Sequence, residues 1–317
     1  QSQRAHLPAD YDYSSTNHNR SAICRYADSV TFTINGRKYV IDEVGIRLKG
    51  ATSRRRFYND LLGLYNPMHL RLCFDCTFDA SEDYGVSAKV WKSEEEREKR
   101  LSRTFATMKS IELKWNITLD NTYTRTLYAH EMFRDFGVPT QLSRLSTVSL
   151  GGCRMGVYRM YEPVDEGFFH RYFPEEDWGG DLYKVRWAQK VPADYTLANT
   201  YGICSKRRNE YYNFDLKTNL DTCDHTSIRR LLEVINRENV TREQMDAVID
   251  SDELAKVMAI NYAIGNLDDL RNNYNNQYIY FRKSDGKAVF IPYDNELVLD
   301  INYFFCPFNF DITAESP

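Results

Sequence analysis

The chain has 317 residues, of which 42% are hydrophobic and 14% aromatic, enough apolar material for two compact domains or one two-lobed domain. This composition excludes a disordered chain and a small disulfide scaffold. Lys and Arg number 41 against 45 Asp and Glu, and the resulting net charge of -4 gives no chain-wide attraction for nucleic acid. No apolar stretch approaches the length needed to span a membrane.

The first part of the chain is polar, and we expect residues 1–29 to form an extended arm. Apolar residues then alternate on both sides of Asn35-Gly36 within Val30–Ile41, which is the strongest short-range signal for a β-hairpin. Alternation in Val44–Leu48 and in Leu70–Phe74 predicts two more half-buried strands. These segments predict that residues 30–165 begin as a strand-rich unit.

Helix signals follow these strands. Ser93–Glu96 has the pattern of a capping box and predicts the start of a charged helix. A loose helical period predicts a second helix over Thr122–Phe136, which Gly137 ends. Two further strands are expected at Ser146–Leu150 and Met155–Tyr161.

The second half of the chain, residues 166–317, is expected to be mostly helical. The apolar residues of Ile228–Ile235 recur at helical spacing, and Asp250–Glu253 has the sequence of a helix cap. One late exception is a predicted hairpin formed by Gln277–Phe281 and Lys287–Ile291.

This late hairpin predicts a site for a hard metal ion at its open end. Asn276 and Asp294 are equally far from Asp285, near which we expect the turn, so an amide oxygen and a carboxylate would face each other. A bulge would shift this register by one residue. Oxygen ligands of this kind suit Mg²⁺. Asp268 precedes Asn276 by a short loop and supplies a further carboxylate, which could act as a base in phosphoryl transfer.

Cysteines and glycosylation sequons favour secretion. Asn19, Asn116 and Asn239 each begin an Asn-X-Ser/Thr sequon. Cys73 and Cys76 form a C-x-x-C pair, but no second tight cysteine pair accompanies it. Disulfides or buried thiols are therefore expected in preference to a zinc site.

Short motifs spread over about residues 44–296 resemble those of the CotH family, which comprises the spore-coat protein H kinases and their relatives. The motifs occur in family order at Val44–Ser53, Asp120–Arg125, Phe133–Pro139, Gly156–Tyr158 with Glu162 and Val164–Asp165, Leu182–Lys184, Asn266–Asp268, Asn275–Tyr280 and Ile291–Asp294.

The resemblance implies an α+β fold of the atypical protein-kinase type. A strand-rich N-lobe (30–165) and a mainly helical C-lobe (166–317) would hold ATP between them, with Mg²⁺ or Mn²⁺. By position, Asp268 would be the catalytic base, with Asp269 the close alternative. Asn276 would be a metal ligand and Asp294 the principal one. Glu296 replaces a carboxylate of the usual motif and is a further candidate metal ligand.

Several cationic residues are candidates for the contact with the ATP phosphates. Lys49 follows the second strand segment, and Arg71 occupies the third-strand position where a kinase carries lysine. Lys109 and Lys114 are the other candidates, and Glu162 belongs to a family motif that would contact the cofactor. A guanidinium differs from an ammonium in reach and geometry, so Arg71 is not a silent replacement.

One departure from the family concerns the helix within Thr122–Phe136. Many relatives carry Arg-Glu where this chain reads Asp120–Thr126. The Lys–Glu ion pair that orients ATP is then expected from elsewhere, with Glu131 as a candidate.

The resemblance implies a secreted or cell-surface kinase that transfers phosphate from ATP to Ser or Thr residues of extracellular or coat proteins. Since the family also contains surface invasins, the alternative is an adhesin-type protein that binds a receptor on a kinase-like scaffold. The histidines lack the spacing of metalloprotease motifs, and no nucleophile elbow surrounds a serine, so hydrolase chemistry is excluded at the motif level.

Overall fold

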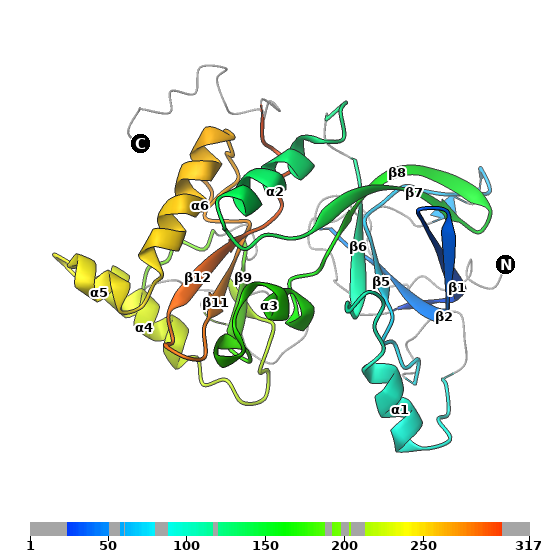
Figure 1. Cartoon of the computed structure of the whole chain (residues 1–317), viewed down its shortest axis with the longest axis horizontal. Helices are drawn as coiled ribbons and strands as arrows, with labels where there is room; N and C mark the ends of the chain where they lie inside the picture. Colours follow the sequence, from blue (N-terminus) through cyan, green and yellow to red (C-terminus); the bar gives the residue numbers. More distant parts are fainter. Residues whose placement is uncertain are drawn as a thin grey trace. The chain divides into compact units, whose positions relative to one another are not determined.

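The computed structural model describes residues 24–50, 58–59, 61–79, 88–116, 120–187, 192–197, 203 and 213–299. The chain divides into two compact units, the first made of Gln1–Ile117 with Leu142–Gly167 and the second of Thr118–Gln141 with Phe168–Pro317. Both units mix helices and strands, in agreement with the α+β class (Figure 1).

The first unit is built on a curved antiparallel sheet with the strand order β1-β2-β5-β6-β8-β7 (Figure 1). The strands are β1 (Arg25–Ile34), β2 (Arg37–Leu48), β5 (Leu70–Cys73), β6 (Ser110–Trp115), β7 (Ser143–Leu150) and β8 (Cys153–Tyr161). The short strands β3 (Tyr58–Asn59) and β4 (Leu64–Tyr65) form a separate pair, and helix α1 (Glu94–Leu101) lies between β5 and β6 in the chain.

The hairpin predicted at Asn35-Gly36 is confirmed, but both of its strands are longer than expected. Ile34 pairs with Arg37, and the pairing continues as far as Arg25 with Ile46. β1 therefore includes residues 25–29 of the expected polar arm, because these residues pair with β2. Residues 1–23 of that arm lie outside the described residues. The helix start predicted at Ser93 is confirmed, since its hydroxyl accepts a hydrogen bond from the Glu96 N–H at 3.2 Å.

One face of the large sheet packs as the hydrophobic core of the first unit. Side chains alternate between the two faces of a strand. On this face the core includes Ile46 of β2, Leu72 of β5, and Ile111 and Leu113 of β6. The opposite face carries the polar residues between them.

The second unit contains a four-stranded sheet with the order β10-β9-β11-β12, formed by β9 (Asp181–Val185), β10 (Phe214–Leu216), β11 (Gln277–Phe281) and β12 (Ala288–Pro292). Its helices are α2 (Arg125–Asp135), α3 (Glu166–Tyr172, which begins in the first unit), α4 (Thr226–Ile235), α5 (Arg242–Asp246) and α6 (Ser251–Ala263). This part of the chain, expected to be mainly helical with one hairpin, is a helix-covered sheet to which β9 and β10 add two unpredicted strands.

Packing on both faces explains why β11 and β12 are continuously apolar. Ile279 and Phe290 share a core with Leu231 of α4. On the opposite face, Tyr280 stacks on Phe169 of α3 with ring centroids 4.2 Å apart. All five residues of each strand are buried, as expected for strands covered on both sides.

Helix α2 falls within residues 30–165, which we expected to form one lobe, but it belongs to the second compact unit. The physical reason is its apolar face. Ala129 and Phe133 of α2 pack with Val257 and Ile260 of α6 and are fully buried.

Candidate functional site

The candidate site is centred on a loop that joins α6 to β11 in the second unit. Asn266 organises its start. Its amide nitrogen donates to the side-chain oxygens of Asn261, at 2.9 Å, and Asn295, at 3.1 Å. Its own side-chain oxygen accepts the Asp268 N–H at 3.1 Å. These buried bonds fix the backbone that presents Asp268.

Asp268 and Asn276 are in direct contact. The Asn276 amide nitrogen donates to the Asp268 carboxylate at 2.7 Å and to the Asp268 carbonyl oxygen at 3.0 Å. Asn273 donates a further hydrogen bond to the same carboxylate. The loop therefore brings the predicted base and one predicted metal ligand together.

Asp294 acts on Asp268 through its charge. Burial raises the pKa of the Asp268 carboxyl above its ordinary value, and the negative charge of Asp294 raises it further. Hydrogen bonds from Asn273, Asn275 and Asn276 oppose this shift. A carboxylate with a raised pKa accepts a proton more readily, which is the property a general base needs.

The predicted pairing of Asn276 with Asp294 is wrong by one residue. Gln277 pairs with Pro292 and Phe281 with Ala288, so Asn276 lies opposite Tyr293, whose N–H donates to the Asn276 carbonyl at 2.9 Å. An even number of residues lies between Phe281 and Ala288, so the turn is centred between two residues and not on Asp285. Asp294 is the residue directly after Tyr293, the partner of Asn276.

Asn276 and Asp294 both have left-handed backbone conformations, with φ of 57° and 59°. Such conformations are uncommon for residues other than glycine and are concentrated at functional sites. Glu296, the third predicted metal ligand, is buried, and its N–H donates to the Asp294 carbonyl at 2.9 Å. The chain thus forms a tight turn after β12 that contains two predicted metal ligands.

These residues fit a hard divalent cation. Mg²⁺ and Mn²⁺ prefer carboxylate and amide oxygens. Asn276 uses its amide nitrogen toward Asp268, so its amide oxygen is not involved in that contact. Asn276 and Asp294 carry oxygen atoms of the kind that such an ion prefers, and water and phosphate oxygens would complete its coordination.

Asp269, the alternative base, has a different environment. Its buried carboxylate accepts from the Arg271 Nε at 2.8 Å and from the backbone N–H groups of Arg271, at 3.0 Å, and Asn272, at 3.2 Å. Arg271 in turn lies over the Tyr262 ring at 3.9 Å. This carboxylate holds the loop in shape.

A separate group of predicted site residues lies on the polar face of the sheet in the first unit. Arg71 of β5 pairs with Glu112 of β6, and Lys114 of β6 pairs with Arg159 of β8. Because paired residues point to the same side, these side chains share one face with Lys49, which follows β2 and contacts Glu112. We call Lys49, Arg71, Lys114 and Arg159, together with Glu112, the cationic face.

Glu112 is the ion-pair partner of Lys49. Burial lowers the pKa of Lys49 to about 8; Glu112 opposes this shift, and the positive charge of Arg71 strengthens it. Glu131, the partner suggested by the family resemblance, instead pairs with Arg134 within α2. The carboxylate that orients Lys49 therefore comes from a strand.

Two further predicted cofactor-binding residues, Lys109 and Glu162, make other contacts in the structure. Lys109 is 45% exposed and forms an ion pair with Glu166 at 3.6 Å. Glu162 is buried, and one of its carboxylate oxygens accepts the Leu142 N–H at 3.1 Å, a bond that ties the end of β8 to the residue before β7. The structure gathers Lys49, Arg71 and Lys114 on one face of the sheet, whereas Lys109 forms its ion pair with Glu166.

Sequence reasoning missed several residues of both groups. Glu112 and Arg159 could have been found from the alternation of apolar and polar residues in β6 and β8, which places charged residues on one face. Lys184 of β9 belongs to a family motif but was given no role. Its ammonium lies 3.9 Å from the ring centroid of Tyr293, the residue before Asp294. Its position depends on the pairing of β9 with β11, which no local signal predicted.

A comparison with protein families matches residues 84–303 to the family described as CotH kinase protein. This match covers more than half of the 317 residues. The chain belongs to the CotH kinase protein family. No curated protein matches the chain at a significant level. Within the described residues, no helix of this CotH protein combines the length and apolar character needed to cross a membrane. The resemblance noted from the motifs is thus confirmed at the level of the family.

Proposed function

We propose that this kinase-like CotH protein is an ATP-dependent protein kinase, with the two-lobed architecture of its atypical class, that phosphorylates Ser or Thr residues of proteins at the cell surface, in a coat or outside the cell. The observation that carries the proposal is the contact of Asp268 with Asn276 beside Asp294. It supports one carboxylate as a base and separate oxygen donors for a metal ion, as phosphoryl transfer requires.

In this proposal the hydroxyl oxygen of the acceptor Ser or Thr forms a bond to the γ-phosphorus of ATP, and the bond between that phosphorus and the leaving ADP oxygen breaks. Asp268 accepts the proton that the hydroxyl loses. Asn273 and Asn276 keep the Asp268 carboxylate in position through their amide hydrogen bonds. Asn266 stabilises the same loop, because its side-chain oxygen accepts the Asp268 N–H.

Asn276 and Asp294 would hold Mg²⁺ or Mn²⁺, with Glu296 as a third candidate, and the ion would neutralise charge on the phosphates. Lys49, Arg71 and Lys114 would bind phosphate oxygens, because cationic donors form strong hydrogen bonds to them. Glu112 orients Lys49 through their ion pair.

The test is transfer of labelled phosphate from ATP to a generic Ser-rich protein in the presence of Mn²⁺ or Mg²⁺. We expect transfer by the wild type, loss of at least about 100-fold in Asp294→Ala, since such electrostatic groups contribute on this scale, and unchanged transfer in Asp135→Ala. Asp135 is an exposed acid at the end of α2 and is the matched control.

An equal loss in both variants would contradict the proposed role of Asp294. If the wild type shows neither transfer nor any nucleotide-dependent change in unfolding temperature, the enzyme proposal fails. The alternative would then be a receptor-binding protein on a kinase-like scaffold.

A further inference from the structure

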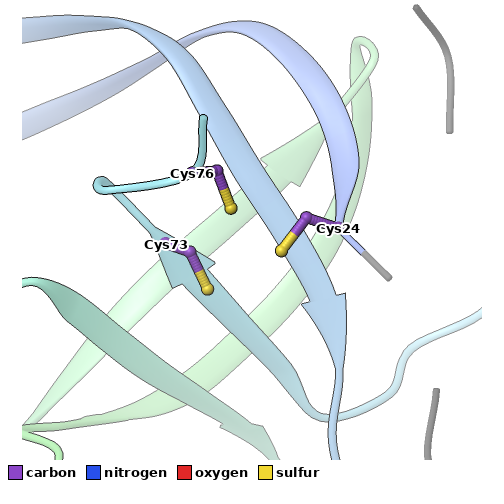
Figure 2. A group of neighbouring side chains, drawn as sticks. All are labelled: Cys24, Cys73 and Cys76. Carbon is purple, nitrogen blue, oxygen red and sulfur yellow. The ribbon is translucent and has the colours of Figure 1, made fainter. Parts of the chain in front are cut away.

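Three cysteines converge in the first unit, and none of them has a role in the proposed phosphoryl transfer. The sulfur atoms of Cys24, Cys73 and Cys76 all lie within 4.8 Å of one another. Figure 2 shows the three sulfurs turned toward the same space beside strand β2. Each of the three is present as a thiol and not in a disulfide.

The sheet brings these residues together from distant parts of the sequence. Cys24 directly precedes β1 and Cys73 ends β5, and both strands pair with β2. At the centre lies Gly45 of β2, which pairs with Tyr26 on one side and Cys73 on the other. Cys76 follows in the C-x-x-C spacing, in which two sulfurs can reach one ion.

Gly45 provides the space that the sulfurs occupy. A Cβ atom at this position would overlap the Cys76 sulfur and lie 3.1 Å from the Cβ of Cys24. No other residue type at position 45 would leave the same room beside β2 for three sulfur atoms. The glycine thus serves the cysteine cluster.

The surroundings combine an apolar cover with nearby positive charge. Cys24 and Cys73 are buried, and the rings of Tyr26 and Phe78 pack edge to face beside them with centroids 5.0 Å apart. Arg47 and Arg71 form the residue pair two positions from Gly45 and Cys73, on the same face of the sheet. These guanidinium groups can balance negative charge on the sulfurs.

We propose that Cys24, Cys73 and Cys76 bind one thiophilic metal ion, Zn²⁺, through three thiolates. Zinc–sulfur bonds of about 2.3 Å place ligand sulfurs about 4 Å apart, which these side chains reach with small rotations. Thiolates select soft or borderline cations. Each cysteine loses its proton on binding. Cys76 is the least buried of the three, so water would reach the ion from its side as the fourth ligand.

This inference is independent of the proposed kinase activity. Zinc here would tie the start of β1 to the end of β5 across β2, so its expected effect is on the stability of the sheet. A disulfide would instead join two of the sulfurs and leave the third outside the bond. The two chemistries therefore give different answers when the protein is purified without reductant.

The experiment measures the zinc content of the full chain, purified without reductant or chelator, by elemental mass spectrometry. Peptide mapping after alkylation is done on the same sample. We expect about one zinc per chain, with all three cysteines alkylated only after a strong chelator is added. Removal of zinc from the wild type should lower the unfolding temperature, and added Zn²⁺ should restore it.

Cys76→Ser should lose the zinc, whereas Cys153→Ser, at the start of β8, should keep it. Chelation of the wild type tests the site even if a cysteine variant fails to fold. A disulfide that includes any of the three cysteines, or reduced protein that takes up no Zn²⁺, would overturn the proposal. Equal zinc loss in the Cys76 and Cys153 variants would overturn it as well.

Discussion

Two adjacent aspartates, Asp268 and Asp269, show how the environment separates the roles of identical side chains. Asp268 meets amide donors and the charge of Asp294. Asp269 forms an ion pair with Arg271 at 2.8 Å, and the two side chains are only 4% and 8% exposed. The first arrangement keeps a carboxylate reactive, and the second uses one to support a loop.

We expect Asp269→Asn to destabilise the protein and Asp268→Asn not to do so. The raised pKa of Asp268 means that the unfolded chain loses this proton at lower pH than the native chain does, so the ionised group destabilises the native state at neutral pH. Asp268→Asn should abolish phosphate transfer and leave the unfolding temperature equal to or above that of the wild type. Asp269→Asn breaks a buried ion pair and should cost about 3–5 kcal/mol.

Chemical denaturation of both variants at pH 7, beside transfer assays, checks this prediction. If Asp268→Asn proves the less stable of the two, the assignment of the loop-supporting role to Asp269 is contradicted. Retained transfer in Asp268→Asn would contradict its role as the base.

Among the elements, those with strong local signals were predicted correctly. Asn35-Gly36 fixed the first hairpin because a two-residue turn of this kind suits the twist of paired strands. Asp250 caps α6 as predicted, with its carboxylate accepting the Glu253 N–H at 3.1 Å. Local hydrogen bonding decides such features, and the residues involved are close in sequence.

Elements that depend on partners distant in the sequence could not be predicted from local signals. β9 and β10 are short and gain their strand conformation from pairing with each other and with β11. The pairing of Lys49 with Glu112 and the approach of Cys24 to Cys73 need the register of the whole sheet. The predicted pairing of Asn276 with Asp294 is wrong for a related reason. The turn is not centred on Asp285 as predicted, so every pair of the hairpin is shifted by one residue.

The first turn of helix α6 is predicted to make stability depend on pH. Burial raises the pKa of Glu253 from its ordinary 4.5 to about 7, and the charge of Asp250 adds to the shift. The native chain then holds this proton at pH values where the unfolded chain has lost it. The stabilising contribution is complete below about pH 4.5 and is lost as the pH rises through about 7.

Thermal unfolding of the wild type and of Glu253→Gln between pH 5 and pH 8 measures this contribution. The wild type should lose more stability over this range than the variant does. Glu233→Gln, which changes an exposed residue of α4, should behave as the wild type. Parallel curves for the wild type and Glu253→Gln would contradict the prediction.

At the scale of the whole molecule, the charge is distributed unevenly. The chain carries a net charge of -4, yet the polar face of one sheet gathers Lys49, Arg71, Lys114 and Arg159. The overall charge disfavours nonspecific binding of polyanions, whereas the local cations suit one small anion such as a nucleoside triphosphate. Binding of this nucleotide should appear as a stabilisation of the entire chain, because a ligand that binds only the native state shifts the unfolding equilibrium.

The last prediction uses this linkage and rests on Lys49. Saturation with MgATP at about 100 times its dissociation constant should stabilise the chain by about 2.7 kcal/mol. Since the pKa of Lys49 is about 8, its ammonium loses the proton as the pH rises through that value, and the stabilisation by MgATP should decline between pH 7 and pH 9.

Lys49→Arg keeps its charge over this range and should show a smaller decline, although the guanidinium geometry differs. Lys109→Ala, which removes an exposed cation paired with Glu166, should retain the decline of the wild type. Calorimetric unfolding with and without MgATP at each pH gives the measurement, and a stabilisation that stays constant from pH 7 to pH 9 in the wild type would show that Lys49 does not bind the nucleotide.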